Sequence, residues 1–385
     1  MVVLVMTTVL YGFSADPIHY GHIDIISRAA AAFDEVVVGI GVNPDKKYLF
    51  SLEERVAMAQ RAVVAMPQVR VVAFEGLLVD YAYEHGISVV VKGARGSTDF
   101  DYELLLHQVG ESQQYGIDTF LLPAKKEYAH VSSTIVKAIQ KEQGLVQGYV
   151  PLFVKQALEA KMVGQYMVGI TGEIGVGKSY VSNMLVERGA MRGILVHNIE
   201  LDHIGHRILD ELVEPVYQGL RQSIVRMFGS EVQLMDSKIN RKVLGEMVFD
   251  DAEKLQQLNA LMEKPLLMRL RRELYGKKGI ILLNAALLAE GGLLELCNNN
   301  VIVVDCDDSL QRERLQGRGL SDQQIERRIR SQYSVLEKKN MISGVIHQHA
   351  QGRMWDVDTS ASLDLNYVDG LLGEITNYFG LNGRI

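Results

Sequence analysis

The residues best suited to chemistry lie near the middle of the chain, where residues 172 to 179 read GEIGVGKS. This matches the spacing GxxxxGK[ST], in which a glycine-rich loop turns its backbone N–H groups towards phosphate oxygens. The glycines of this loop are Gly172, Gly175 and Gly177. Lys178 is expected at the β and γ phosphates of a nucleoside triphosphate such as ATP, and the Ser179 hydroxyl at Mg²⁺. An apolar strand precedes the loop and a helix follows, which favours a phosphate site over a glycine-rich turn that binds nothing.

A second candidate site follows the first apolar stretch, where residues 14 to 22 read SADPIHYGH. His19 and His22, spaced HxGH at the start of a helix, can place two imidazoles beside a phosphate. Gly21 lets a nucleotide approach the backbone closely. Such groups suit a reaction in which negative charge builds up on phosphorus, because positive charge and hydrogen bonds stabilise it without covalent attack. The motif is short, so core or helix-capping histidines are the alternative.

Asp202 lies after the second expected strand of the P-loop region, in the stretch ELDHIGH. A carboxylate at that strand end faces the phosphates, where it can accept a proton from an attacking hydroxyl or bind Mg²⁺ through water. The alternative is that Asp202 only caps the following helix.

Arginines crowd residues 312 to 330, a helical stretch that is interrupted at residues 317 to 319. A capping box at residues 321 to 324 predicts that the helix restarts there. Phosphotransferases use a mobile arginine-bearing lid to exclude water and neutralise the transferring group. Any single arginine here could instead form ion pairs on a solvated helix face. As a group they predict a lid.

Strand and helix patterns alternate along both halves of the chain. Strands are expected at residues 2–10, 35–42, 69–74, 88–92 and 118–122, and then at 166–171, 193–198, 279–283 and 301–305. This alternation predicts an α/β protein of two domains, a Rossmann-like parallel sheet followed by a P-loop kinase fold with a helical lid. We place the domains at residues 1–162 and 166–385, each of normal domain size.

The composition of the chain excludes some classes of protein. The chain has 385 residues, 48% of them hydrophobic and 23% charged, so both halves can bury a core. A net charge of −7 and a pI of about 5.9 argue against a nucleic-acid binder held by a basic surface. Cys297 and Cys306 have neither metal nor disulfide spacing. No run reaches the length of a membrane span and no secretory signal is recognisable, so we expect a cytoplasmic protein.

The first half resembles the bacterial-type phosphopantetheine adenylyltransferases, members of the HxGH nucleotidyltransferase superfamily. Four blocks occur in the family's order: DPIHYGHIDII, then NPDKKYLFSLEERV at 43–56, KGARGSTDFDYE at 92–103 and HVSSTIVKAI at 130–139. With YVPLFVKQAL at 149–158, the resemblance covers residues 1 to 162. It implies transfer of AMP from ATP to 4′-phosphopantetheine, which releases pyrophosphate and gives dephospho-coenzyme A.

The resemblance also implies roles for individual residues. His19 and His22 would contact the ATP phosphates, and Lys46 would bring charge to the reacting phosphate. Lys92 and Arg95 match two arginines of the family, and a lysine keeps the charge but loses the planar fork. Other positions match the nucleotide pocket: Ser14, where the family usually has threonine, Glu103, Ser132, Ser133 and Thr134. Two positions near the motif depart from the usual Gly and Phe: Phe13 and Ala15.

The second half resembles dephospho-coenzyme A kinase. The blocks VGITGEIGVGKS, ELDHIGH, NRKVLGEMVF, LNALMEKPL, ALLAE and VIVVDCDDSLQRERLQGRGLS follow the family's order over residues 166 to 360. This implies that Asp202 is the base for the ribose 3′-hydroxyl, and that Arg314 and Arg318 are the charges of the lid. Two positions depart from the family. Asn284 begins Asn-Ala-Ala where the family has Asp-x-Pro, and Lys264 replaces a histidine before Pro265.

The two resemblances concern consecutive reactions, so we interpret the chain as a bifunctional enzyme that converts 4′-phosphopantetheine, through dephospho-coenzyme A, to coenzyme A. Both steps need ATP with Mg²⁺, and the expected partners are small molecules, possible further copies of the chain, no nucleic acid and no membrane. One alternative is an adenylyltransferase for another phosphorylated substrate, joined to a generic nucleotide kinase. The other, kept open by Asn284, is a second half that binds nucleotide or coenzyme A without turnover.

Overall fold

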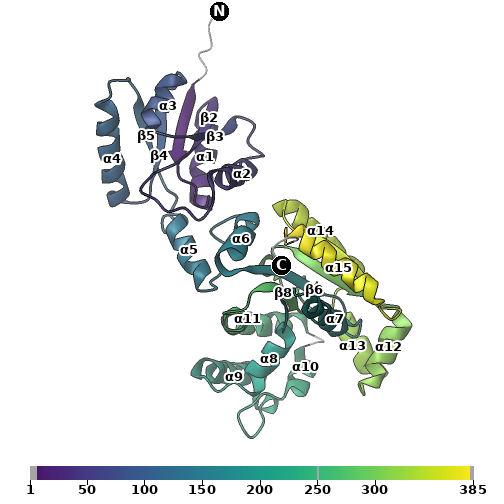
Figure 1. Cartoon of the computed structure of the whole chain (residues 1–385). Helices are drawn as coiled ribbons and strands as arrows, with labels where there is room; N and C mark the ends of the chain where they lie inside the picture. Colours follow the sequence, from purple (N-terminus) through teal and green to yellow (C-terminus); the bar gives the residue numbers. More distant parts are fainter. Residues whose placement is uncertain (1–6, 249–250, 382–385) are drawn as a thin grey trace, which may run out of the picture. The chain divides into compact units, whose positions relative to one another are not determined.

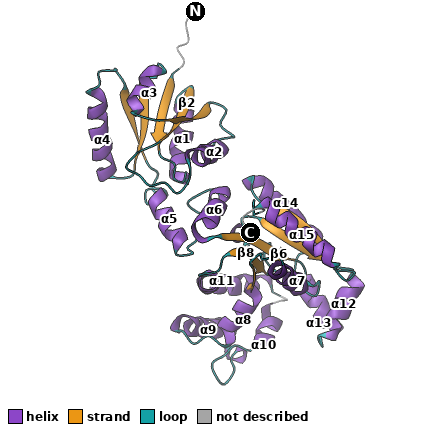
Figure 2. Cartoon of the chain, in the orientation of Figure 1, coloured by secondary structure: helices purple, strands orange, loops and turns teal. Residues whose placement is uncertain are grey.

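The computed structural model describes residues 7–248 and 251–381. The chain divides into two compact units, Met1–Met162 and Val163–Ile385. Each unit contains one five-stranded sheet whose strands are all parallel, flanked by helices (Figure 2). This confirms the predicted α/β class.

The first unit has the strand order β3-β2-β1-β4-β5. Its strands are β1 (Thr8–Phe13), β2 (Glu35–Gly41), β3 (Val69–Phe74), β4 (Val89–Ala94) and β5 (Asp118–Pro123). Its helices are α1 (Tyr20–Ala32), α2 (Leu52–Ala62), α3 (Leu78–Glu84), α4 (Ser97–Glu111), α5 (Ser133–Lys141) and α6 (Leu152–Leu158), and the π-helix Glu159–Val163 follows. The order reverses between β1 and β4, and in open parallel sheets ligands bind at such a point, outside the carboxyl ends of the strands.

The sheet of the first unit is buried on both faces. Val9 and Tyr11 of β1 pack into one hydrophobic cluster together with Ile25 of α1, whereas Leu10 packs into a second cluster with Ala82 of α3. A strand buried on both sides reads as a continuous apolar run, which is why these strands were visible in the sequence.

The second unit has the order β10-β9-β6-β8-β7, with β6 in the centre. Its strands are β6 (Gln165–Thr171), β7 (Val196–Glu200), β8 (Gly279–Asn284), β9 (Asn300–Asp305) and β10 (Arg353–Asp358). Helices α7 (Lys178–Met191), α14 (Val335–His349) and α15 (Leu365–Tyr378) lie close to the sheet (Figure 1). A helical region contains α8 (Leu201–Asp210), α9 (Pro215–Phe228), α10 (Arg241–Val248) and α11 (Ala252–Leu274), and the arginine-rich stretch forms α12 (Asp308–Gly317) and α13 (Asp322–Arg330). Two 3-10 helices, Ser230–Val232 and Leu294–Cys297, complete the described part of the unit.

Capping boxes begin the helices after Ser51 and Ser321, and the second of them confirms the predicted restart. The Ser51 hydroxyl accepts from the Glu54 amide at 3.2 Å, and the Glu54 carboxylate accepts from the Ser51 amide at 2.7 Å. The same reciprocal pair joins Ser321 and Gln324. Each box satisfies two backbone donors that the first turn of a helix leaves without partners.

Several element boundaries differ from the predictions. β1 continues to Phe13 instead of ending at residue 10, and the predicted residues 2–6 lie outside the described part. β7 starts at Val196, later than expected, because Gly193 has φ 72° and ends α7, and the Ile194 amide bonds to Gly189 at 2.8 Å. Strand β10 was not predicted from the sequence.

Candidate active sites

The HxGH motif lies in the loop between β1 and α1. His19 precedes the first residue of α1, and its ring stacks on the His22 ring with centroids 3.6 Å apart. Phe13, at the end of β1, stacks on the other side of His22 at 4.2 Å. Gly21 is needed beside this stack, since a Cβ there would lie 3.1 Å from the His19 ring. Thus Phe13, a departure from the family pattern, helps to fix the orientation of His22.

Both histidines are neutral near pH 7. Burial and the nearby Arg95 charge lower the pKa of His19 to about 3. Burial, His19 and Arg95 lower the pKa of His22 well below its usual range. The Nδ1 atom of His22 accepts a hydrogen bond from the His19 amide at 3.4 Å, so its proton is on Nε2. The lowered pKa values therefore do not support the expected positive charge on these rings in the free protein.

Two buried charges hold the motif loop. The Asp16 carboxylate accepts from the Phe50 amide at 2.9 Å and from Lys137 Nζ at 2.6 Å. Burial raises the pKa of Asp16, but the bonds from Lys137 and from the backbone outweigh it, so the pKa is lowered. Arg55, also buried, donates to the carbonyl of Ser14 and to that of Gly41 at 2.9 Å. Sequence reasoning assigned no role to Asp16 or Arg55, although Asp16 lies within the motif.

The predicted cations of the first site have different surroundings. Lys92 pairs with Glu103 at 3.3 Å, so the structure brings these two predicted residues together. The Arg95 guanidinium makes a two-point contact with Asp99, at 2.6 and 3.2 Å, and is close enough to the histidines to affect their pKa values. Lys46 is exposed in the loop between β2 and α2, and within the described residues its side chain has no hydrogen bond or ion pair.

Ser132 and Ser133 tie α5 to the motif loop. The Ser132 hydroxyl caps α5 by accepting from the Ile135 amide at 3.2 Å, and the Ser133 hydroxyl donates to the Pro17 carbonyl at 2.8 Å. Ser14 contributes its carbonyl to the loop through Arg55. In the free protein these serines have structural partners beside the HxGH stack.

The glycine-rich loop of the second unit joins β6 to α7. Its glycines have the positive φ angles that favour glycine: Gly172 at 147°, Gly175 at 88° and Gly177 at 99°. The Lys178 ammonium folds back and donates to the carbonyls of Gly172 at 3.0 Å and Glu173 at 2.8 Å. Burial lowers the pKa of Lys178 to about 8, and the opposing effect of the Asp202 charge is smaller.

Ser179 and Glu200 form a pair of oxygen donors at the end of β7. The Ser179 hydroxyl donates to Glu200 Oε1 at 3.1 Å, and the Asn198 amide approaches the same oxygen at 3.3 Å. A hydroxyl and a carboxylate suit Mg²⁺, which is usually held by one or two protein oxygens together with substrate phosphates. In the part of the chain that is described, no three His, Cys, Asp or Glu residues form a group that could hold a metal ion. Glu200, two residues before Asp202, was not predicted.

Asp202 lies in the first turn of α8, but Glu200 is the N-cap residue, so the capping alternative for Asp202 is wrong. Asp202 is exposed, and its Oδ2 accepts from the Ala286 amide, which follows β8, at 3.4 Å. Asn284, the departure from the family pattern, is buried at the end of β8 and donates to the Ser182 hydroxyl at 3.4 Å. A neutral amide fits this buried position without a compensating charge.

The two predicted lid arginines differ. Arg314 on α12 donates to the Thr359 hydroxyl at 3.0 Å and to its carbonyl at 2.9 Å, and Thr359 also adjoins Gly177. It is therefore fixed beside the phosphate loop. Arg318, just after α12, is exposed, and its charge contributes to lowering the pKa of Lys178.

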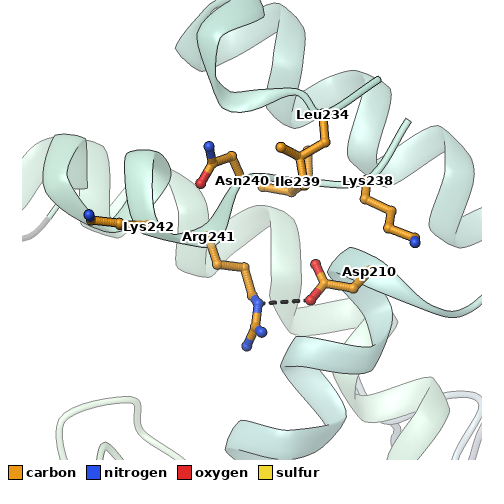
Figure 3. Close-up of a pocket in the computed structure, with 7 residues that line it drawn as sticks. All are labelled: Asp210, Leu234, Lys238, Ile239, Asn240, Arg241 and Lys242. Atoms are coloured by element: carbon orange, nitrogen blue, oxygen red, sulfur yellow. Dashed lines mark ion pairs between the residues drawn. The ribbon is translucent and has the colours of Figure 1, made fainter. Parts of the chain in front are cut away.

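An open pocket of about 390 Å³ lies apart from the predicted residues, between the end of α8 and the start of α10 (Figure 3). Arg241 crosses it to pair with Asp210 at 2.8 Å. Its lining residues are Asp210, Leu234, Lys238, Ile239, Asn240, Arg241 and Lys242.

Within the described residues, no helix combines the length and apolar character needed to span a membrane.

Comparison with known proteins agrees with the division into two sites. The dephospho-CoA kinase family model matches residues 166–352, and the cytidylyltransferase-like family model matches residues 10–139. The phosphopantetheine adenylyltransferase of Actinobacillus succinogenes is 41% identical over 156 residues, which are 40% of this chain and 97% of that protein. That of Pseudarthrobacter chlorophenolicus is 45% identical over 148 residues, 38% of this chain and 89% of that protein.

Two solved structures are similar to parts of the chain. TT1252 from Thermus thermophilus has a TM-score of 0.42 and 26% identity, over 54% of this chain and 96% of that one. The dephospho-CoA kinase from Campylobacter jejuni has a TM-score of 0.31 and 18% identity, over 55% of this chain and 97% of that one. From the sequence relatives and the family models, the chain belongs to the phosphopantetheine adenylyltransferase family and carries a dephospho-CoA kinase domain after that part.

Proposed function

We propose that the chain catalyses two consecutive reactions. In the first, AMP passes from ATP to 4′-phosphopantetheine, giving dephospho-coenzyme A and pyrophosphate. In the second, ATP phosphorylates the ribose 3′-hydroxyl of that product, giving coenzyme A and ADP. The observation that carries the proposal is the presence, in one chain, of an HxGH stack and of a glycine-rich phosphate loop with a carboxylate beside it. We further propose residues 1–162 and 166–385 as the two catalytic domains.

In the first site, the proposed role of His19 and His22 is to donate hydrogen bonds to phosphate oxygens. His22 carries its proton on Nε2 and is held between Phe13 and His19, so its ring is oriented before ATP binds. Because both rings are neutral in the free site, the positive charge at the α-phosphate would come from lysine and arginine side chains. The proposed sources and pocket residues are Lys46, Lys92, Arg95, Ser14, Gly21, Glu103, Ser132 and Ser133.

In the second site, the backbone of Gly172, Gly175 and Gly177 would hold the phosphates, while Lys178 exchanges its two carbonyl partners for phosphate oxygens. Ser179, with Glu200, is the proposed holder of Mg²⁺, which neutralises phosphate charge when bound. Asp202 would accept the proton of the attacking hydroxyl, and Arg314 and Arg318 would face the transferring group from the lid.

The proposal is tested by incubating the purified full chain with 4′-phosphopantetheine and MgATP, and by following four products by chromatography. Coenzyme A formed together with pyrophosphate and ADP supports both steps. If no product forms, the acceptor is a different phosphorylated compound, and the first assignment fails.

A second candidate function, adenylyl transfer with a nucleotide-binding but inactive second domain, is favoured by one observation. Asn284 occupies a buried position where the family has a carboxylate. On this alternative, dephospho-coenzyme A would accumulate without ADP. Supplying dephospho-coenzyme A and MgATP directly to the chain then tests the second reaction independently of the rate of the first.

A further inference from the structure

A buried ion pair lies beside the phosphate loop but belongs to neither predicted site. Lys338 on α14 is 0% exposed, and its ammonium pairs with the Glu290 carboxylate and donates to the Ala286 carbonyl at 2.9 Å. Burial lowers the pKa of Lys338, and the bond to Glu290 opposes this. A buried pair often stabilises a protein no more than well-packed apolar residues would, because desolvation offsets the attraction. A contribution to stability is therefore a weak explanation for this pair.

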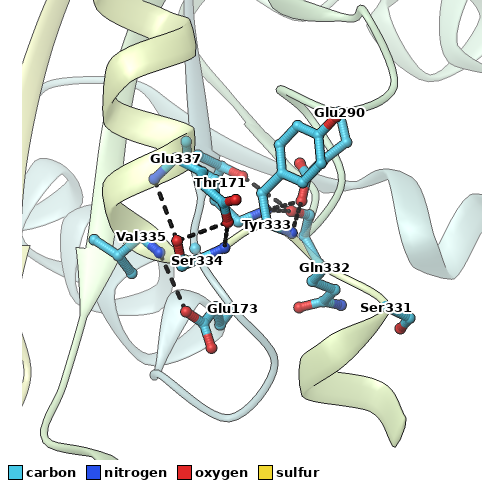
Figure 4. Close-up of polar contacts among 12 residues, drawn as sticks. Thr171, Glu173, Glu290, Ser331, Gln332, Tyr333, Ser334, Val335 and Glu337 are labelled. Atoms are coloured by element: carbon cyan, nitrogen blue, oxygen red, sulfur yellow. Dashed lines mark hydrogen bonds and ion pairs between the residues drawn. The ribbon is translucent and has the colours of Figure 1, made fainter.

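The pair anchors the segment that connects the lid to the rest of the unit. Residues 331–334 join α13 to α14, and the Tyr333 amide donates to Glu290 Oε1 at 3.0 Å. Figure 4 shows Tyr333 close to Glu290, with Glu173 and Val335 joined on another side of the same segment.

The same segment is bonded directly to the phosphate loop. The Val335 amide donates to Glu173 Oε1 at 3.1 Å, and the Ile174 amide donates to the Gln332 side chain at 2.9 Å. Glu173 and Ile174 are two of the variable positions of the GxxxxGKS motif. The base of the lid is thus fastened to the loop that binds phosphate and, through Glu290, to the segment after β8.

Ala286 connects this network to the candidate base. Its carbonyl accepts from Lys338 Nζ and from the Thr171 hydroxyl, the latter at 3.1 Å. Its amide donates to Asp202 at 3.4 Å. Lys338 therefore contacts Ala286, the residue whose amide bonds to Asp202. Through Glu290, Lys338 is also linked to the base of the lid.

We propose that Lys338 and Glu290 are positioning residues for phosphoryl transfer, which set the lid and Asp202 relative to the phosphate loop. This rests on the proposed kinase function. Lys338 is fully buried and so does not itself contact ATP. Misplacing reacting groups by about 1 Å can cost about 10²-fold in rate, so a residue remote from the ligand can have a large kinetic effect.

The kinetic test compares the full chain with the variants Lys338→Met and Lys338→Met/Glu290→Gln. The double variant removes both charges at similar volume, so it avoids leaving one charge buried alone. The control is Lys339→Met, the neighbouring lysine, whose pair with Asp356 at 2.9 Å lies at the surface. With supplied dephospho-coenzyme A, we expect kcat to fall by about 10- to 100-fold in both test variants, with little change in the KM for ATP. The control keeps its kcat.

Rescue separates positioning from general stability. Glu290→Gln keeps an acceptor for the Tyr333 amide, whereas Glu290→Ala does not, so we expect the Gln variant to retain much more kcat at similar Tm. The proposal is overturned if the double variant has normal kcat, or if kcat falls only in proportion to loss of folded protein. Should Lys338→Met fail to fold, the double variant decides.

A second measurement does not need turnover. Hydrogen exchange of the full chain should show that ATP protects the amides of Tyr333 and Val335 in the wild type and in Lys339→Met, but not in the double variant. Equal protection in all three would overturn the coupling. If the wild type shows this protection but phosphorylates no dephospho-coenzyme A, the proposed kinase function fails while the link between lid and loop stands.

Discussion

The two candidate sites differ in the kinds of group that are available to bind phosphate. In the first unit the groups are side chains that already have partners: His22 lies in an aromatic stack, Lys92 pairs with Glu103, and Arg95 pairs with Asp99. In the second unit the groups are mainly backbone amides of a glycine-rich loop, together with one half-buried lysine.

This difference affects how each site uses charge. The rings of the first site are neutral near pH 7, and two of its cations, Lys92 and Arg95, must leave or share an acidic partner to reach a ligand. In the second site the lysine of the phosphate loop, Lys178, only has to leave carbonyl groups. We therefore expect the second site to depend more strongly on a single side chain.

The largest effect is expected from Lys178→Ala. Phosphorylation of dephospho-coenzyme A should fall by about 10³-fold or more, because a preorganised charge at the phosphates is lost, while adenylyl transfer is kept. Assays of each half-reaction on the same preparation measure this, with Lys278→Ala as a control for loss of a lysine. Loss of both activities would mean that the two sites are not independent.

The second-largest effect is expected from His22→Ala, which should impair adenylyl transfer and leave the kinase reaction intact. Adenylyl transfer should fall by about 10²- to 10³-fold, since an oriented donor is removed, and the kinase reaction on supplied dephospho-coenzyme A should persist. His85→Ala, an exposed histidine on the same unit, is the matched control. If His22→Ala stopped the kinase reaction instead, our assignment of the sites to the units would be wrong.

A smaller effect is expected when the pH is raised, and it should distinguish the ATP affinities of the two sites. The pKa of Lys178 is about 8, so its ammonium loses a proton as pH rises through that value, and ATP binding by the second unit should weaken from about pH 7 to about pH 9. Lys178→Arg, always charged, should remove this dependence. In the first site the histidines are already neutral at pH 7, so raising the pH removes no charge from them. Calorimetric titration of ATP into Lys178→Ala and His22→Ala measures each site separately, and a pH-independent affinity at the second site would contradict the assignment.

The smallest effect is expected from Asn284→Asp. A carboxylate at this buried position should lower the free energy of unfolding by about 1 kcal/mol or more, while the kinase kcat changes by only a few-fold. Thermal unfolding and steady-state kinetics check both parts. Asn340→Asp adds the same charge at an exposed position of α14 and should leave both unchanged. A large gain in kcat would show that Asn284 limits the second reaction.

Much of the fold could be predicted from the sequence because its signals are local. The buried strands are continuous apolar runs, and the capping boxes at Ser51 and Ser321 are four-residue patterns. The loop ending in Ser179 is recognised from the spacing of its glycines, lysine and serine. Strand β10 was missed because Arg353–Asp358, at the edge of the sheet, has charged residues among its apolar ones and is neither a continuous apolar run nor a strict alternation.

The supporting residues of the sites could not be predicted, for a physical reason. Asp16 meets Lys137 across 121 positions of the chain, and Lys338 meets Glu290 across 48. Only folding brings such partners together, and an isolated charged residue in the sequence is more often on the surface. Glu200 could have been found, because it ends a strand two residues before Asp202. The protonation of His19 and His22 depends on burial, which the motif does not reveal.

The bonds that Lys178 makes to its own loop also bear on product release. When ADP leaves, the ammonium can return to the carbonyls of Gly172 and Glu173, so the departing nucleotide does not leave a buried charge without partners. Binding and release of the nucleotide then exchange one set of acceptors of the Lys178 ammonium for another, so the lysine keeps hydrogen-bond partners in both states.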